Sequence, residues 1–214
     1  MITTTPVARW TWGRDHHDTD TVDLCLRELL SAYAVLATHH LVVDSAVVHV
    51  EVPEAGKPKN ILFEGDFAVN GSEISAEYAS QLADQIQAGR QTGPVGSVDT
   101  LIECTGILSE DANEIIQPKL FRLATHAYRD YITTSLVTFS DAWMPYDLKG
   151  RAQPAIYSAH QPRLAAALRN LSDVLDSETD PDDSTYFGTP TETGVDNYFE
   201  PDGSPSDVWA RYEV

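Results

Sequence analysis

VHVEVPEAGKPKNILFEGDFAV, residues 48–69, alternates apolar and polar side chains on both sides of a turn. The valines of its first half fall on one face of an extended chain, while His49 and Glu51 fall on the other. Such a pattern is typical of an antiparallel hairpin that covers a core with one face only. We therefore predict a β-hairpin with strands over 41–52 and 61–69.

Helical and extended patterns flank this hairpin. Before it, apolar residues at three- and four-residue spacing predict a helix over 20–39 with Asp20 as its N-cap. The later elements are a helix over 75–89, strands over 98–108, 115–125 and 131–140, and a helix over 162–175. The order αββαβββα has runs of strands with few helical crossovers, so it favours the α+β class. We predict a mainly antiparallel five-stranded sheet with about three helices packed on it.

The carboxyl-terminal residues have a different composition from the rest of the chain. Residues 173–214 contain twelve Asp and Glu side chains against one base, Arg211, so they carry -11 of the total charge of -19. Six aromatic residues recur among these polar residues, and solvated linkers rarely hold so many. We predict a long acidic coil that wraps the domain. The predicted organisation is a polar segment (1–19), one α+β domain (20–176) and an acidic arm (177–214).

No familiar catalytic or cofactor motif stands out in the chain. His16, His17, Asp18 and Asp20, with His39 and His40 after the first helix, lack the fixed offsets of zinc ligands. Cys25 and Cys104 lie in apolar segments, which favours buried, reduced thiols. Residues 93–97 lack the lysine and the following helix of a phosphate-binding loop. We predict no catalytic residue, no metal and no cofactor.

The net charge of -19 also limits the possible partners, because binding of nucleic acid needs clustered Lys and Arg. The amino terminus has neither the basic nor the apolar region of a signal peptide, and the chain lacks a run of about 20 apolar residues. We expect a cytoplasmic protein that binds neither nucleic acid nor membrane.

One loop combines aromatic side chains with carboxylates. Residues 140–147 contain Asp141, Trp143, Met144, Tyr146 and Asp147. Trp, Tyr and Met are enriched in interface cores, and neighbouring carboxylates can receive Arg or Lys from a partner. The alternative is that these aromatic side chains close the core of the domain.

The leading functional hypothesis is a non-catalytic acidic binding protein that neutralises a basic partner, a toxin or nuclease for example, by occlusion. Immunity proteins and nucleic-acid mimics have this physical profile. The predicted binding residues are those of the 140–147 loop just named, together with Asp180, Asp182 and Asp183 of the arm.

Two other classes of function remain open. The first is a small-ligand enzyme or binding domain whose pocket lies between sheet and helices and uses Glu64, Asp66 or Glu103. The second is a subunit of an assembly or scaffold. A deep cavity with convergent polar groups would favour the ligand site, whereas a filled interior beneath a broad acidic face would favour the binding protein.

Overall fold

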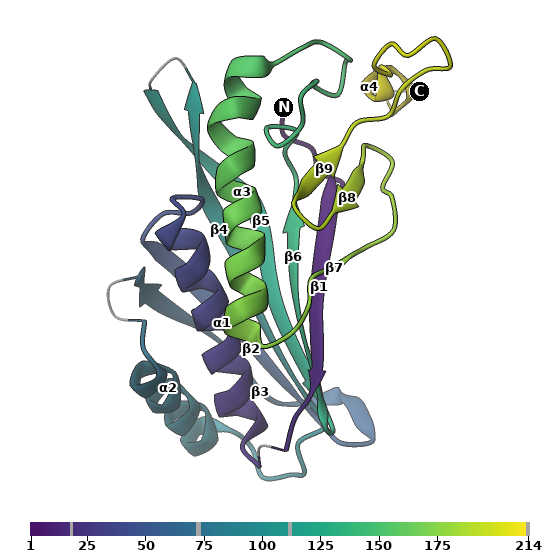
Figure 1. The fold of residues 1–214 in the computed structure, drawn as a ribbon. Helices are drawn as coiled ribbons and strands as arrows, with labels where there is room; N and C mark the ends of the chain where they lie inside the picture. Colours follow the sequence, from purple (N-terminus) through teal and green to yellow (C-terminus); the bar gives the residue numbers. More distant parts are fainter. Residues whose placement is uncertain (18, 72–73, 111–112, 213–214) are drawn as a thin grey trace.

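The computed structural model describes residues 1–17, 19–71, 74–110 and 113–212, and it has an α+β fold. Seven strands form one antiparallel sheet in the order β3-β2-β4-β5-β6-β1-β7, and the three long helices lie on one side of it (Figure 1). The strands are β1 (Ala8–Asp15), β2 (Ser45–Glu54), β3 (Lys57–Asn70), β4 (Ser97–Glu110), β5 (Asn113–Tyr128), β6 (Tyr131–Thr138) and β7 (Asp180–Pro181). The helices are α1 (Thr21–Thr38), α2 (Ala76–Gly89), α3 (Pro154–Leu175) and the short α4 (Val208–Tyr212).

The α+β class is confirmed, but the prediction of five strands was too low. β1 occupies part of the predicted polar segment and pairs with β6 along its whole length. Its sequence ARWTWGRD directs Ala8, Trp10 and Trp12 into the core, and all three are buried. A strand whose apolar positions are two tryptophans between polar residues has the required alternation, although its composition is that of a polar segment.

The helices follow local signals in the sequence. The Asp20 carboxylate accepts hydrogen bonds from the backbone N–H groups of Val22 and Asp23, which confirms it as the N-cap of α1. Ser75 caps α2 in the same way. α3 begins at Pro154, eight residues before the predicted start, so Pro162 lies inside the helix. Between these helices and the sheet, the core is filled by large apolar side chains.

The carboxyl-terminal segment, residues 177–212, is not the long coil that we predicted. It forms β7, a hairpin of β8 (Thr189–Thr191) and β9 (Gly194–Asp196), and α4, joined by turns. The Trp10 indole donates to the carbonyl oxygen of Thr191 at 2.7 Å, and the Thr185 hydroxyl donates to that of Val7 at 2.7 Å. Phe187 is fully buried. Residues 213 and 214 of the predicted arm lie outside the described residues.

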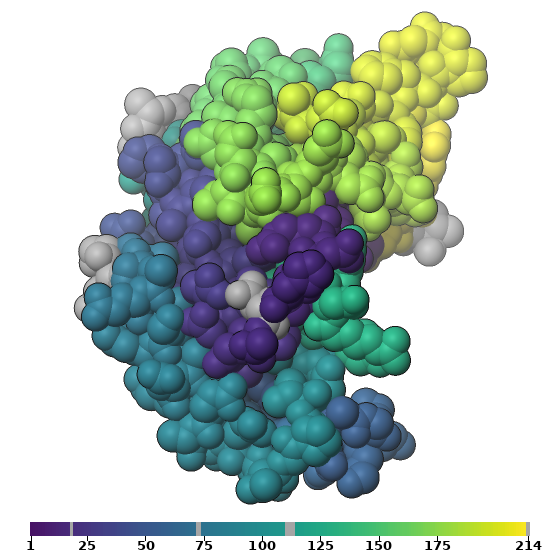
Figure 2. Space-filling view, turned by 60° about the horizontal axis from the view of Figure 1, so that its bottom comes forward, coloured from purple at the N-terminus to yellow at the C-terminus, as the bar shows by residue number. Residues whose placement is uncertain are grey.

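Other segments of the chain contact both edges of the sheet. At the β3 edge, Tyr78 of α2 donates to the carbonyl oxygen of Ala68, and the Gln91 N–H after α2 donates to that of Leu62. At the opposite edge, β7 pairs with β1, and Figure 2 shows the carboxyl-terminal segment beside the purple amino-terminal strand. A covered edge does not pair readily with a strand of another chain. The exposed part of the sheet is therefore its second face, opposite α1, α2 and α3.

Among the described residues, no helix is both long and apolar enough to cross a membrane.

Candidate binding surface

The sheet face turned away from the helices is rich in carboxylates. Residues directly opposite each other on antiparallel strands share a face, so the register defines its rows. One row runs from Glu64 through Glu51 and Asp99 to His126. We call this surface the acidic sheet face and define it by eleven charged or titratable residues: Arg9, His49, Glu51, Glu64, Asp66, Asp99, Glu103, Arg122, His126, Asp180 and Asp182.

Several carboxylates of the acidic sheet face contact a base on a neighbouring strand. His49 Nδ1 lies 2.8 Å from Asp66 Oδ1, and His126 Nδ1 lies 2.6 Å from Asp99 Oδ1. Arg122 contacts Glu103 through both Nε and a terminal nitrogen, at 2.7 and 2.6 Å. Seven carboxylates against two guanidinium groups nevertheless leave the face negative. These side chains are exposed, 68% for Asp66 and 52% for His126, so a partner can reach them.

Two of the predicted arm residues belong to this face. Asp180 is the register partner of Thr11, and Asp182 lies 3.6 Å from Arg9, so both sit at its β1 edge. Asp183 is also exposed. The structure therefore places the arm carboxylates Asp180 and Asp182 on the same sheet face as the strand carboxylates of β2, β3 and β4, at the opposite edge of that face.

The predicted anchors in the 140–147 loop are placed differently. Trp143, Met144 and Asp141 have no exposed surface, so they offer nothing for a partner to contact in this structure. The Trp143 ring stacks on Phe121 with a centroid distance of 5.2 Å, and its indole donates to the Thr138 hydroxyl at 2.7 Å. These contacts correspond to the alternative considered for this loop, in which its aromatic residues close the core.

Asp141 has an internal structural role. Its carboxylate forms an ion pair with the α-amino group of Met1 and accepts a hydrogen bond from the Leu148 N–H at 3.1 Å. Burial raises the pKa of Asp141, while the amino group and the hydrogen bonds act in the opposite direction. This carboxylate fastens the loop to the start of the chain.

The remaining two loop residues are partly exposed. Tyr146 packs edge-on against Phe199 at 6.0 Å between ring centroids. Asp147 accepts hydrogen bonds from the backbone N–H groups of Lys149 and Arg151, both at 2.9 Å, and so holds a turn. The predicted loop cluster is therefore not a single exposed patch.

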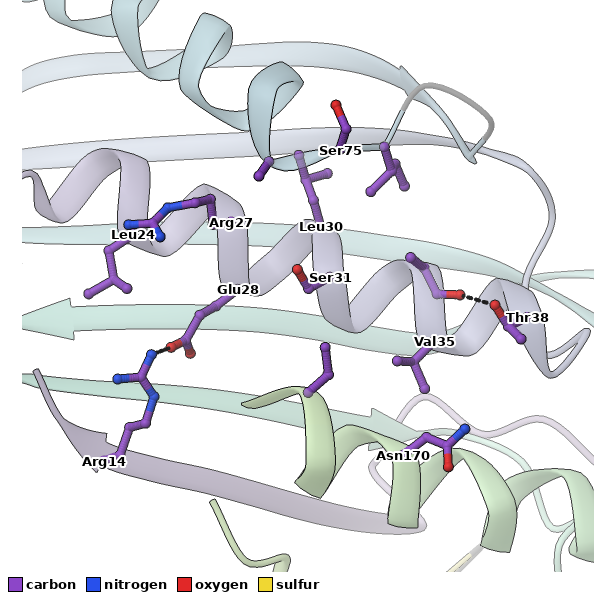
Figure 3. A pocket seen from close by; sticks show the side chains of 14 residues that line it. Arg14, Leu24, Arg27, Glu28, Leu30, Ser31, Val35, Thr38, Ser75 and Asn170 are labelled. Atoms are coloured by element: carbon purple, nitrogen blue, oxygen red, sulfur yellow. Dashed lines mark hydrogen bonds and ion pairs between the residues drawn. The ribbon is translucent and has the colours of Figure 1, made fainter. Parts of the chain in front are cut away.

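The helical side of the molecule has a groove of about 560 Å³ along α1, between the start of α2 and the end of α3 (Figure 3). Its charged end holds an ion pair between Arg14 and Glu28. Arg14 also donates to the carbonyl oxygen of Leu175, and Glu28 accepts from the Thr134 hydroxyl, so both side chains are already bonded within the fold. Burial raises the pKa of Glu28, against the opposing effect of Arg14. We interpret this ion pair as structural.

The carboxylates proposed for a small-ligand pocket do not line that groove. Glu64, Asp66 and Glu103 lie on the acidic sheet face, on the side of the sheet opposite the helices. A pocket between sheet and helices therefore could not use them.

The acidic sheet face also contains a shallow depression of about 500 Å³ between β2, β3 and β4. Val47, Ala68 and Leu101 form apolar parts of its wall, and His49 and Glu103 contribute polar atoms. Sequence reasoning missed this depression, because it depends on where the pairing between β2 and β4 stops.

The histidines and cysteines considered for metal binding or catalysis do not come together. In the described parts of the chain, no group of three or more His, Cys, Asp or Glu side chains is arranged to hold a metal ion. Asp18 of the amino-terminal cluster lies outside the described residues. Cys25 and Cys104 are buried, and this burial raises the pKa of both thiols, which makes them poor nucleophiles.

Comparison with known proteins adds no relative: no family model matches the chain, and no match is found among curated proteins or solved structures.

Proposed function

We propose that this protein is a non-catalytic binding protein that neutralises a basic partner, such as a toxin or nuclease, by covering its cationic site with the acidic sheet face. The observation that carries the proposal is the placement of seven carboxylates and two arginines on an exposed sheet face. An excess of one charge on a contact surface steers a partner of the opposite charge.

The alternative surfaces support this choice. Contacts from α2 and from the carboxyl-terminal segment occupy part of each sheet edge, which disfavours addition of a partner strand there. In the groove along α1, the charged groups at one end are bonded to each other and to the fold. The acidic sheet face is broad and accessible, and it carries seven carboxylates against two arginines.

The exposed carboxylates and the depression on the acidic sheet face would act at different stages of binding. The exposed carboxylates are on a rim-like surface, where charge mainly raises the association rate and makes it sensitive to salt. The apolar wall of the depression offers contacts that slow dissociation once water is excluded. Asp180 and Asp182 extend the charged surface to the β1 edge.

A matched pair of charge variants tests the proposal. The first combines Glu64→Gln, Asp66→Asn and Asp180→Asn on the acidic sheet face. The control combines the same kinds of change at exposed helix positions, Glu77→Gln, Asp84→Asn and Asp173→Asn. Both variants lose three negative charges, but they lose them from different surfaces of the molecule.

Association with a panel of basic bacterial nucleases is measured by surface plasmon resonance at about 0.02 M and about 0.2 M salt. The face variant is expected to associate about tenfold more slowly at low salt and to show a flatter salt dependence of the association rate. In the control variant, the association rate and its salt dependence should each change by less than about twofold. Inhibition of the bound nuclease should weaken in parallel. Equal effects of the two variants would show that net charge, and not this face, governs binding.

A further inference from the structure

The depression on the acidic sheet face exists because β2 and β4 part from each other. Their register covers only His49–Glu51 against Asp99–Leu101. The chain before β2 meets β4 again where the Val43 N–H donates to the carbonyl oxygen of Thr105 at 3.1 Å. Between these two points the strands are not paired, and the gap opens on the acidic sheet face.

Other contacts hold the gap open. The Tyr33 hydroxyl of α1 lies 2.6 Å from the carbonyl oxygen of Val43 and 3.3 Å from that of Ser45. On its other side, β2 stays paired with β3 from Ser45 onward. The depression is therefore built by strand pairing and a buried tyrosine, and it does not depend on exposed side chains alone.

The lining combines apolar walls with one available carboxylate oxygen. Val47, 54% exposed, and Leu101 lie on opposite sides of the gap, and the buried Val69 lies at its floor. At the rim, both contacts from Arg122 to Glu103 go to Oε1. Among the described residues, Glu103 Oε2 accepts no hydrogen bond.

We propose that this depression is the anchor site for an arginine side chain of the basic partner. The inference rests on the proposed function and names the chemistry of the contact. The methylene stem of arginine would lie on Val47 and Leu101, and its guanidinium would donate to Glu103 Oε2. The contact with Arg122 shows that the Glu103 carboxylate accepts a guanidinium on this face. Arginine suits such a site better than lysine, because its planar fork donates in fixed directions while its stem packs on apolar surface.

The test compares two peptides of equal charge, hexa-arginine and hexa-lysine, by titration with ¹⁵N chemical-shift mapping. The wild-type chain is expected to bind hexa-arginine at least about threefold more tightly, with the largest shifts at Val47, Leu101 and Glu103. Equal affinities, or shifts spread evenly over the acidic residues, would overturn the proposal.

Filling the depression without changing its charge provides the second test. Ala68→Trp places a ring in the depression, and Val47→Trp does so from the other strand. Ser135→Trp puts the same ring on the same face but two strands away from Leu101. The first two variants should lose the preference for arginine, while Ser135→Trp keeps it. A preference that survives in both filled variants would overturn the anchor site.

The two proposals fail in different ways. If both peptides bind the wild-type chain equally and both lose affinity in the Glu64→Gln, Asp66→Asn, Asp180→Asn variant, the anchor is wrong and the acidic sheet face still binds. If neither peptide binds that face, both proposals are wrong.

Discussion

Glu28 is a buried carboxylate whose ionisation opposes folding. Burial is the largest influence on it and raises its pKa, while Arg14 and Thr134 act in the other direction. The folded chain therefore keeps the proton to higher pH than the unfolded chain, and stability falls as pH rises between the ordinary and the raised pKa. Glu28→Gln removes this titration and retains an acceptor for Arg14.

We predict that the free energy of unfolding of the wild-type chain, minus that of Glu28→Gln, decreases as the pH rises from about 4 to about 7. Urea unfolding at several pH values measures this difference. A difference that is constant or increases with pH would mean that the Arg14 ion pair outweighs burial.

Substitution of Trp143 tests whether this residue acts as a core residue or as a binding anchor. Trp143→Phe removes buried volume next to Phe121. It also removes the indole N–H that donates a hydrogen bond to the Thr138 hydroxyl. We expect a loss of about 1–3 kcal/mol of stability in chemical denaturation, with unchanged association to a basic nuclease. Trp209→Phe, at a partly exposed position, is the control and should cost less than about 1 kcal/mol. Slower association of folded Trp143→Phe would restore this residue to the interface.

At the scale of elements, the sequence predicted what depends on local alternation and missed what depends on distant partners. The central hairpin and the cap at Asp20 are visible as patterns, and both are present. The depression was not predictable, because it depends on where the pairing between β2 and β4 stops, and β3 and α2 separate these strands in the sequence. The placement of Asp180 beside Thr11 likewise depends on a contact between the two ends of the chain.

The composition of the carboxyl-terminal segment is ambiguous, because it combines the polar residues of a linker with the aromatic residues of an ordered segment. Its aromatic residues correctly indicated order, but short strands such as β7 and β8 leave too brief a pattern to detect. In the 140–147 loop, the residue types of an interface and of a core are the same, so composition alone could not separate the two placements of Trp143.

Substitutions of two neighbouring aromatic residues test how much the carboxyl-terminal segment contributes to the free energy of unfolding. Phe187 is fully buried and packs against Tyr212 at 5.1 Å between centroids, whereas Tyr186 is 46% exposed. Phe187→Ala is expected to lower the free energy of unfolding by about 3 kcal/mol, and Tyr186→Ala by less than about 1 kcal/mol. Urea denaturation gives both values. Similar small losses would show that the segment contributes little to the stability of the domain.

The whole molecule carries a net charge of -19, with 33 acidic against 14 basic side chains. Carboxylates of the acidic sheet face lie on neighbouring strands, so they repel one another in the folded state. Salt should relieve this repulsion. We predict that raising NaCl from about 0.02 to about 0.5 M raises the thermal midpoint by about 2–5 °C.

The Glu64→Gln, Asp66→Asn, Asp180→Asn variant should show a smaller salt increment than the Glu77→Gln, Asp84→Asn, Asp173→Asn control, because Glu64 and Asp66 lie near other carboxylates on β2 and β4. Equal increments would place the repulsion elsewhere on the molecule. A basic partner seated on the acidic sheet face would relieve the same repulsion as salt does, and its binding would add to stability by linkage. The repulsion stored in the free protein would then favour the complex, and salt would stabilise the free protein while it weakens the complex.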